Sequence, residues 1–201
     1  MSMTLVAIVS WGLFPFRSNA QLINDYEYVD LGLPSRIKWA TCNVGAVSPS
    51  DYGDYFAWGE TEPKDTYTHQ NNDTWETYLG DISGNPQYDA ARANWGSSWR
   101  LPTKKEWEEL RRVCRWKWSI LNNCRGYKVI GRNGKSIFLP AAGYRSESSL
   151  HEAQKIGGYW SSTPVDQDNT QRAYRYNIYR ENYIRSQSYR YRGWSVRPVS
   201  K

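Results

Sequence analysis

The chain has 201 residues, a length that suits one well-buried domain or two small ones. Its hydrophobic content of 39% is low, but it contains 11 Trp and 16 Tyr, so aromatic side chains must build much of the core. The net charge is +6 and is concentrated in residues 166–201, with eight Lys or Arg against three Asp or Glu, while three Cys without a C-x-x-C spacing and two His argue against a zinc site.

Residues 1–20 have the layout of an export signal. Residues 5–16 form an apolar run that is too short for a membrane span, and the small residues Ser18 and Ala20 precede Gln21 as at a cleavage site. Because the first residues lack Lys and Arg, a second interpretation is an N-terminal strand or helix docked on the domain. We expect a signal peptide, a secreted or cell-surface protein, and no membrane span in the mature chain.

The following part of the chain alternates between short strands and irregular segments. Residues 26–41 predict two short strands around a Gly-Leu-Pro turn, because apolar and polar residues alternate on both sides of it. Residues 51–60 are aromatic and punctuated by glycine, which indicates a buried irregular segment. Residues 62–86 are rich in Asn, Asp and Thr and predict a long surface excursion.

Two helices are predicted in the middle of the chain. Residues 89–95 suit a short one. The second has the sharpest local signal, because Thr103 is a natural N-cap and Glu106, three residues later, closes a capping box. Its predicted buried face consists of Trp107, Leu110, Val113 and Cys114.

Short strands dominate the remainder. Residues 116–118 alternate as in a strand, and residues 127–130 and 136–139 predict a hairpin around a glycine-bounded turn. Further strands are predicted at 157–163, 173–179, 183–186 and 194–199. The pattern indicates an α+β fold over residues 26–201: a single domain with short strands, one or two helices and long irregular loops.

Tyr and Arg interleave along residues 172–197, which we call the tail. These residue types dominate recognition surfaces. Ile178 is expected to face inward, and strand alternation then places Arg175, Asn177 and Tyr179 outward. An edge hairpin with a solvated polar face is the alternative, although such faces usually carry Lys, Glu and Thr. The predicted ligand-binding residues are Arg175, Asn177, Tyr179, Arg180, Asn182, Tyr183, Arg185, Gln187, Tyr189, Arg190, Tyr191 and Arg192.

The tail also indicates a class of partner. A basic, aromatic surface attracts acidic partners, which include glycans and nucleic acid. Lys is scarce in the tail, and this argues against single-stranded nucleic acid, because phosphate contacts usually recruit Lys. We expect a protein or glycan ligand and a monomeric protein. Replacing Tyr189, Arg190, Tyr191 and Arg192 together by Ala is expected to abolish binding with little change in melting temperature.

Six strings carry a resemblance to a known family: 39–45 (WATCNVG), 55–60 (YFAWGE), 99–103 (WRLPT), 138–145 (FLPAAGYR), 159–163 (YWSST) and 195–199 (SVRPV). In this order they resemble the Fibrobacter succinogenes major paralogous domain, over residues 26–199. The resemblance implies a C-type lectin-like fold, as in the similar formylglycine-generating enzymes, and an exported bacterial protein whose C-terminal strands and loops carry the ligand. The tail is similar to the variable proteins of diversity-generating retroelements, which hold a hypervariable C-terminal surface.

The sequence offers no convincing arrangement of catalytic residues. The formylglycine-generating enzymes bind copper through two C-terminal cysteines, and this chain has no Cys after Cys124. His69 and His151 stand alone in polar segments, where a solvated side chain is expected. We expect a non-enzymatic ligand-binding module without a metal or cofactor. A structural or adhesin-like surface subunit and an enzyme relative that has lost the copper-binding cysteines are the alternatives.

The three cysteines leave the disulfide pairing open. A disulfide between Cys114 and Cys124 and one between Cys42 and Cys114 are both compatible with the sequence.

Overall fold

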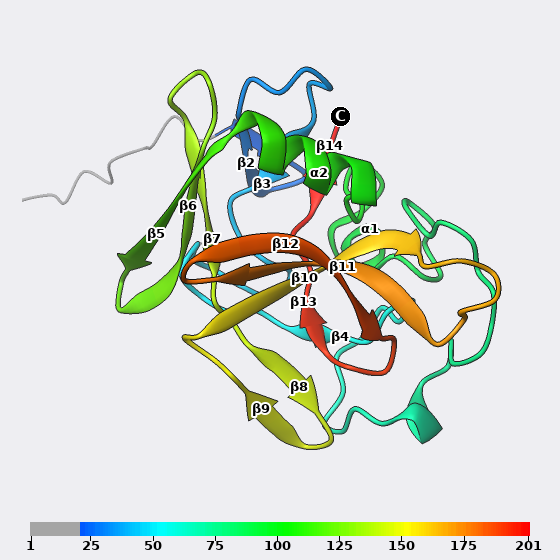
Figure 1. The fold of residues 1–201 in the computed structure, drawn as a ribbon. Coiled ribbons are helices and arrows are strands. Elements are labelled where there is room, and N and C mark those ends of the chain that lie inside the picture. The colour runs from blue at the N-terminus through cyan, green and yellow to red at the C-terminus, as the bar shows by residue number, and fades with distance from the viewer. Residues whose placement is uncertain (1–20) are drawn as a thin grey trace, which may run out of the picture.

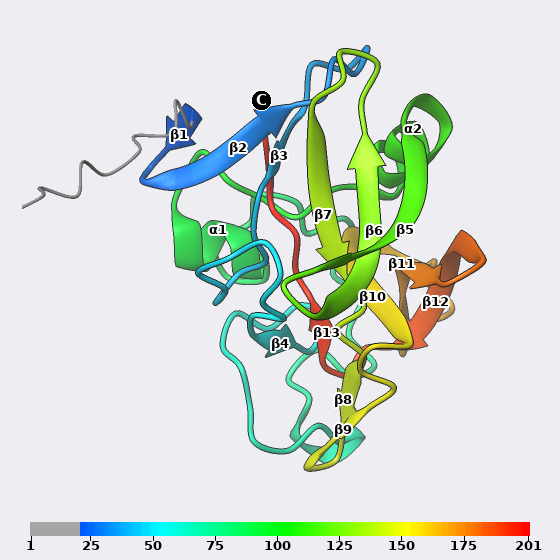
Figure 2. The same cartoon turned by 90° about the vertical axis from the view of Figure 1, so that its left-hand side faces the viewer.

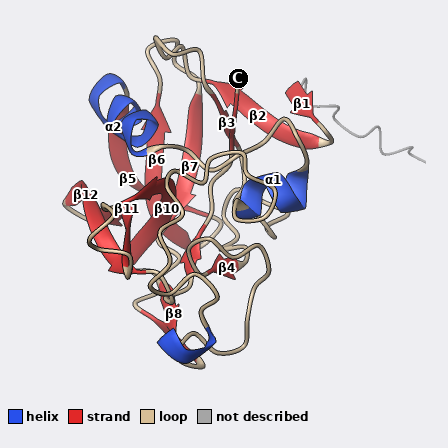
Figure 3. Cartoon of the chain, turned by 90° about the vertical axis from the view of Figure 1, so that its right-hand side faces the viewer, coloured by secondary structure: helices blue, strands red, loops and turns tan. Residues whose placement is uncertain are grey.

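The computed structural model describes residues 21–201, so the predicted signal segment 1–20 lies outside the described residues. Within 21–201 the chain forms four β-sheets, two α-helices and one 3-10 turn, which confirms the α+β class (Figure 1). The two α-helices lie on opposite sides of the strands (Figure 3). In the part of the chain described, neither helix has the length and apolar character needed to cross a membrane.

The first sheet joins the two ends of the described chain. It contains β1 (Gln21–Ile23), β2 (Tyr26–Asp30), β3 (Lys38–Ala40) and β14 (Val199–Ser200), in the order β1-β2-β3-β14. Strands β2 and β3 flank the Gly-Leu-Pro turn, which confirms the two strands predicted there. Figure 2 shows the C-terminal segment running between the strands to reach β3. The last strand is therefore built into the N-terminal sheet.

Both predicted helices are present. Helix α1 (Ala90–Trp95) begins at Asp89, whose carboxylate accepts from the backbone N–H groups of Ala91 and Arg92. Helix α2 (Lys104–Val113) begins at Thr103, and the capping box with Glu106 is formed. Of the predicted buried face of α2, Trp107, Leu110 and Cys114 are buried and Val113 is half-buried.

A three-stranded sheet follows α2. It contains β5 (Arg115–Leu121), β6 (Cys124–Ile130) and β7 (Ser136–Pro140), joined by two tight turns. Asn122 and Asn123 make the first turn with positive φ angles, a conformation that Asn tolerates well. The predicted hairpin of residues 127–139 is confirmed. All three cysteines are free, so neither of the two disulfides considered above is formed.

The third sheet contains the tail. Its order is β12-β11-β10-β13-β4, with β4 (Tyr55–Phe56), β10 (Ile156–Pro164), β11 (Arg172–Tyr179), β12 (Asn182–Tyr189) and β13 (Trp194–Ser195). Strand β13 runs parallel to β10 and antiparallel to β4. A separate hairpin of β8 (Tyr144–Ser146) and β9 (Ser149–His151) lies at the end of this sheet (Figure 1).

Indole rings form much of the core, as the composition predicts. The fully buried indoles belong to Trp39, Trp58, Trp99, Trp107, Trp160 and Trp194. Most of their N–H groups find a backbone carbonyl: Trp58 donates to Ser161 and Trp160 donates to Phe56, at 2.8 and 2.7 Å. Large rings with a satisfied polar atom allow strands this short to bury a continuous core.

The predicted surface excursion, residues 62–86, is largely exposed and contains only the 3-10 turn η1 (His69–Asn71). It is anchored at a few points. Tyr67 is buried and forms an isolated bridge with Glu147 in the β8–β9 turn, and Thr74 is buried with its hydroxyl donating to Trp58 O at 2.7 Å. These contacts bring the excursion beside the β8–β9 hairpin and the end of the tail.

Candidate ligand-binding surface

The β11–β12 hairpin carries most of the tail and has two different faces. Residues directly opposite each other in an antiparallel pair share a face. Tyr176 lies opposite Arg185, and this face looks toward α2, where the Tyr176 ring stacks on Trp107 with the centroids 5.3 Å apart. Asn177 lies opposite Ile184 on the second face, which points away from α2.

Strand alternation predicts only part of this arrangement. Ile178 is fully buried, which confirms its inward orientation. The prediction that Asn177 lies outward is wrong, because only 2% of it is exposed. The chain returns over this face after the hairpin, and Trp194 packs against Gly158, the residue of β10 paired with Asn177. Asn177 donates to the Tyr179 hydroxyl at 2.8 Å, and its Oδ1 is buried without a donor.

The prediction that Arg190 binds a ligand is also wrong, because none of its side chain is exposed. Its guanidinium carbon lies 4.3 Å from the centre of the Trp58 ring, and Nη1 donates to the carbonyls of Thr74 and Thr77 at 3.1 and 2.6 Å. Burial lowers the pKa of Arg190 to about 10. Arg190 therefore ties the excursion to the end of β12, and it is part of the frame and not of a ligand surface.

Beside Arg190 the excursion and the tail form what we call the aromatic cluster: His69, Trp75, Tyr189 and Tyr191. The Tyr189 and Tyr191 rings are stacked with centroids 5.6 Å apart, and Trp75 lies 5.6 Å from Tyr191 and 6.1 Å from Tyr189. Arg172 lies over the Tyr189 ring at 4.4 Å. These three rings are half-buried and His69 is exposed, so a partner can reach the cluster.

Arg175 and Arg192, which we call the arginine pair, lie on a second stack of rings. The Arg175 guanidinium lies over Trp194 at 3.8 Å, and the Arg192 guanidinium lies over Tyr144 at 5.3 Å. Trp194 and Tyr144 stack on each other at 4.8 Å, and Tyr144 stacks on His151 at 5.2 Å. Arg192 also lies 5.8 Å from Tyr189, so the arginine pair and the aromatic cluster form one continuous surface.

The charges of the arginine pair are not neutralised within the described part of the chain. Burial and, to a smaller extent, the charge of Arg192 lower the pKa of Arg175 to about 10, although Tyr179 and Tyr144 act in the opposite direction. None of the ion pairs within residues 21–201 includes Arg175 or Arg192. Nε and Nη1 of Arg175 and Nε of Arg192 are buried without an acceptor, although both side chains are partly exposed.

Comparison with protein-family models, curated proteins and solved structures found no match. The function of this surface is therefore argued from its own chemistry. Stacked rings supply apolar contact area, and guanidinium groups supply planar sets of donors. This combination suits recognition of a ligand.

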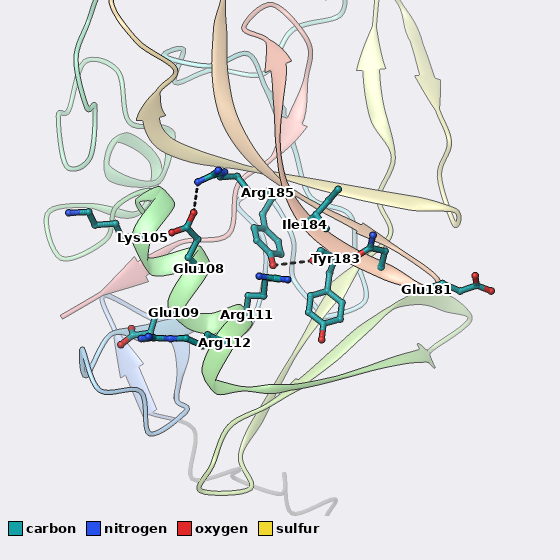
Figure 4. A pocket seen from close by; sticks show the side chains of 11 residues that line it. Lys105, Glu108, Glu109, Arg111, Arg112, Glu181, Tyr183, Ile184 and Arg185 are labelled. Carbon is teal, nitrogen blue, oxygen red and sulfur yellow. Dashed lines mark hydrogen bonds and ion pairs between the residues drawn. The ribbon is translucent and has the colours of Figure 1, made fainter.

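The other face of the hairpin forms a groove with α2, with a volume of about 970 Å³ (Figure 4). Asn182, Tyr183 and Arg185 line it from β12. Arg185 pairs with Glu108 at 2.6 Å, and the Tyr183 ring stacks on Trp116 at 4.5 Å. The groove is lined by both acidic and basic side chains. Because Arg185 and Glu108 already pair with each other, fewer of these charges are free to bind a ligand.

The predicted ligand-binding residues therefore do not form one surface. Arg175, Tyr179, Tyr191 and Arg192 belong to the continuous surface described above. Tyr189 lies by register on the α2 side at the end of β12 and joins this surface through Arg192. Tyr183, Arg185 and exposed Gln187 lie on the α2 side of the hairpin. Arg180 and Asn182 are exposed at the turn between the strands, and Asn177 and Arg190 are buried.

The sequence did not predict that Trp75, Tyr144 and His151 belong to this surface. They join it from parts of the chain far from the tail. A Trp within an otherwise polar excursion was the available signal for Trp75. His69 and His151 are exposed, which confirms the solvated interpretation. Residues 21–201 contain no group of three or more His, Cys, Asp or Glu side chains that could hold a metal ion.

Proposed function

We propose that this chain is a non-enzymatic, exported ligand-binding module that presents the aromatic cluster and the arginine pair to a protein or glycan ligand. One observation carries the proposal: half-buried rings and unpaired guanidinium groups are held at the surface by a frame of fully buried side chains. Trp194 and Arg190 belong to that frame. Tyr and Arg in such partly desolvated positions contribute most to binding in known interfaces.

The distribution of the six family-like strings supports the same proposal. Each string supplies buried frame residues, such as Trp39, Trp99 and Trp160, and the last supplies the fully buried Arg197. None of the strings falls between residues 172 and 192, where the surface residues of the tail lie. We propose a C-type lectin-like domain of the Fibrobacter succinogenes major paralogous type, with a tail that can vary while the frame is kept.

The proposal is tested with a double variant, Tyr189→Ala with Tyr191→Ala, that leaves Arg190 in place. We expect the wild-type protein to bind members of a glycan and protein array and the variant to lose those signals, with a melting temperature close to wild type. Tyr78→Ala removes a ring that is 55% exposed outside the surface and serves as the matched control. Unchanged binding by the double variant would contradict the proposal.

The variable tail has a separate genetic test. If a retroelement diversifies the tail, a reverse transcriptase gene and a near-copy of the last coding segment will lie beside this gene. Differences between the copies should then fall on codons of surface residues such as Tyr179 and Tyr191, and should spare Trp194. A neighbourhood without either element would reject diversification and leave the ligand-binding proposal intact.

A further inference from the structure

Arg175 and Arg192, unlike Arg185, Arg190 and Arg197, have no acceptor for their guanidinium groups within residues 21–201, and part of each group is shielded from solvent. Arg190 and Arg197 are buried but donate to backbone carbonyls, and Arg185 is paired with Glu108. A buried cationic group without a partner is less favourable than a satisfied one, because its desolvation is not offset. Arg175 and Arg192 therefore carry charge that an external anion would compensate.

We propose that Arg175 and Arg192 together bind the carboxylate of an Asp or Glu side chain on a partner protein, while the aromatic cluster packs against apolar residues beside that side chain. This inference rests on the proposed function and specifies its ligand. Guanidinium groups bind carboxylates with paired, charge-assisted hydrogen bonds. Stacking on Trp194 and Tyr144 fixes the planes of both groups before a ligand arrives.

A protein partner fits the surface better than a glycan does. Tyr, Trp and Arg are the residues enriched at the centres of protein interfaces. The surface is also assembled from the excursion, the β8 strand and the tail, a breadth that suits a protein more than a single sugar.

Nucleic acid fits less well. A strand of phosphates is usually followed by a row of cationic side chains that includes Lys. Here the arginine pair is flanked by Tyr179, Asn177 and Ile184, which carry no charge, and Glu181 lies in the adjoining turn. Two neighbouring guanidinium groups match one carboxylate.

The test selects binders to the full-length protein from a yeast-displayed library of random peptides and measures the affinity of the selected peptides by calorimetry. We expect the peptides to share an Asp or Glu. Changing that residue to Asn or Gln should weaken binding to the wild-type protein at least about tenfold. The same change should have little effect on binding to Arg175→Gln or Arg192→Gln, because the two substitutions remove one shared interaction.

Arg132→Gln is the matched control, since Arg132 is exposed in the β6–β7 turn and outside the surface. Thermal melting accompanies each variant. Arg175→Gln could lower the melting temperature because the side chain no longer packs on Trp194. In that case the affinities of the peptides are compared between the wild type and Arg192→Gln. Sialyllactose, an oligogalacturonate and an oligothymidylate are titrated in parallel as acidic probes of other classes.

The outcomes separate the two proposals. Peptides that need Tyr189 and Tyr191 but tolerate loss of their acidic residue would overturn the carboxylate site and leave the ligand-binding module standing. Binding of an acidic probe at the arginine pair, with no acid-dependent peptide, would also overturn the protein partner. Failure of every peptide and probe to depend on the tyrosines or the arginines would overturn both proposals.

Discussion

Arg197 is fully buried, and its guanidinium is nevertheless well satisfied. It donates to the Asn43 side chain at 2.9 Å and to the backbone carbonyls of Ala40 and Phe138 at 3.0 and 2.9 Å. Arg190 is a second buried arginine that uses backbone carbonyls as acceptors. An arginine can thus hold irregular segments together, because its donors point in several directions at once.

Replacement of Arg190 by Ala should therefore destabilise the fold, and the quadruple Ala variant that includes it should lose stability for the same reason, contrary to the expectation from sequence. The change removes a guanidinium from the Trp58 ring and leaves the carbonyls of Thr74 and Thr77 without their donor. We expect a loss of about 2–4 kcal/mol in the free energy of unfolding, measured by urea denaturation. Arg180→Ala, at an exposed position in the same tail, should change it by less than about 0.5 kcal/mol. Equal effects of the two variants would place Arg190 outside the frame.

Among the elements, α2 owes its position to its first turn. Thr103 Oγ1 accepts from Glu106 N–H at 3.3 Å, and Glu106 accepts from Thr103 N–H at 2.8 Å. Arg100 Nη2 then pairs with the same carboxylate at 2.5 Å. The N-terminus of α2 is thereby fixed to the segment before it, and Trp107 is aimed into the core.

Thr103→Ala should cost about 1 kcal/mol of stability, because one N–H group at the start of α2 loses its acceptor. Thr103→Ser retains the hydroxyl and is the matched control, with a free energy of unfolding close to wild type. Both values are measured by urea denaturation at neutral pH. If Ser and Ala at this position had the same effect, the hydroxyl would not be the stabilising group.

Glu106 adds a pH dependence. Burial alone would raise its pKa, but the hydrogen bonds from Arg100 and Thr103 outweigh burial, and the pKa of Glu106 lies below its usual range. A carboxyl group with a lowered pKa in the folded state contributes stability above its unfolded pKa of about 4.3 and loses it as the pH falls through the folded value. Stability of the wild type should therefore fall more steeply below about pH 4 than that of Glu106→Gln. Parallel curves in acid denaturation would contradict this.

Local signals in the sequence were sufficient for several of these elements. The capping box of α2 and the hairpin of residues 127–139 depend on neighbouring residues, and the structure contains both. The burial of Asn177 and Arg190 depends on segments that lie far away in the chain and cover the tail. Residue type and spacing therefore indicate the segment in which we propose the surface, but not which side chains of the tail belong to the frame.

Residues 194–200 link two of the sheets of the molecule. Strand β13 pairs with β10 and β4, and β14 pairs with β3, so residues 194–200 connect the third sheet to the first. Val199 also bridges to Arg100, just before α2. The first and third sheets are therefore joined through this short segment.

Deletion of residues 194–201 should prevent folding, because it removes two strands together with Trp194 and Arg197 from the core. We expect the near-ultraviolet circular dichroism of the buried indoles to disappear and the protein to become sensitive to protease. Deletion of Lys201 alone, which is exposed, should leave both properties unchanged. A cooperative melting transition in the longer deletion would contradict this role.

Strand β10 precedes the β11–β12 hairpin, and strands β13 and β14 follow it. The hairpin is therefore fixed to the domain at both of its ends. Its surface positions can then be exchanged as a set, in the way that loops are grafted onto an antibody framework. A combinatorial library randomised at Tyr179, Ile184, Tyr189 and Tyr191, with Arg190 and Trp194 held constant, should yield folded members in high proportion. This arrangement thus offers a starting point for engineering binding surfaces.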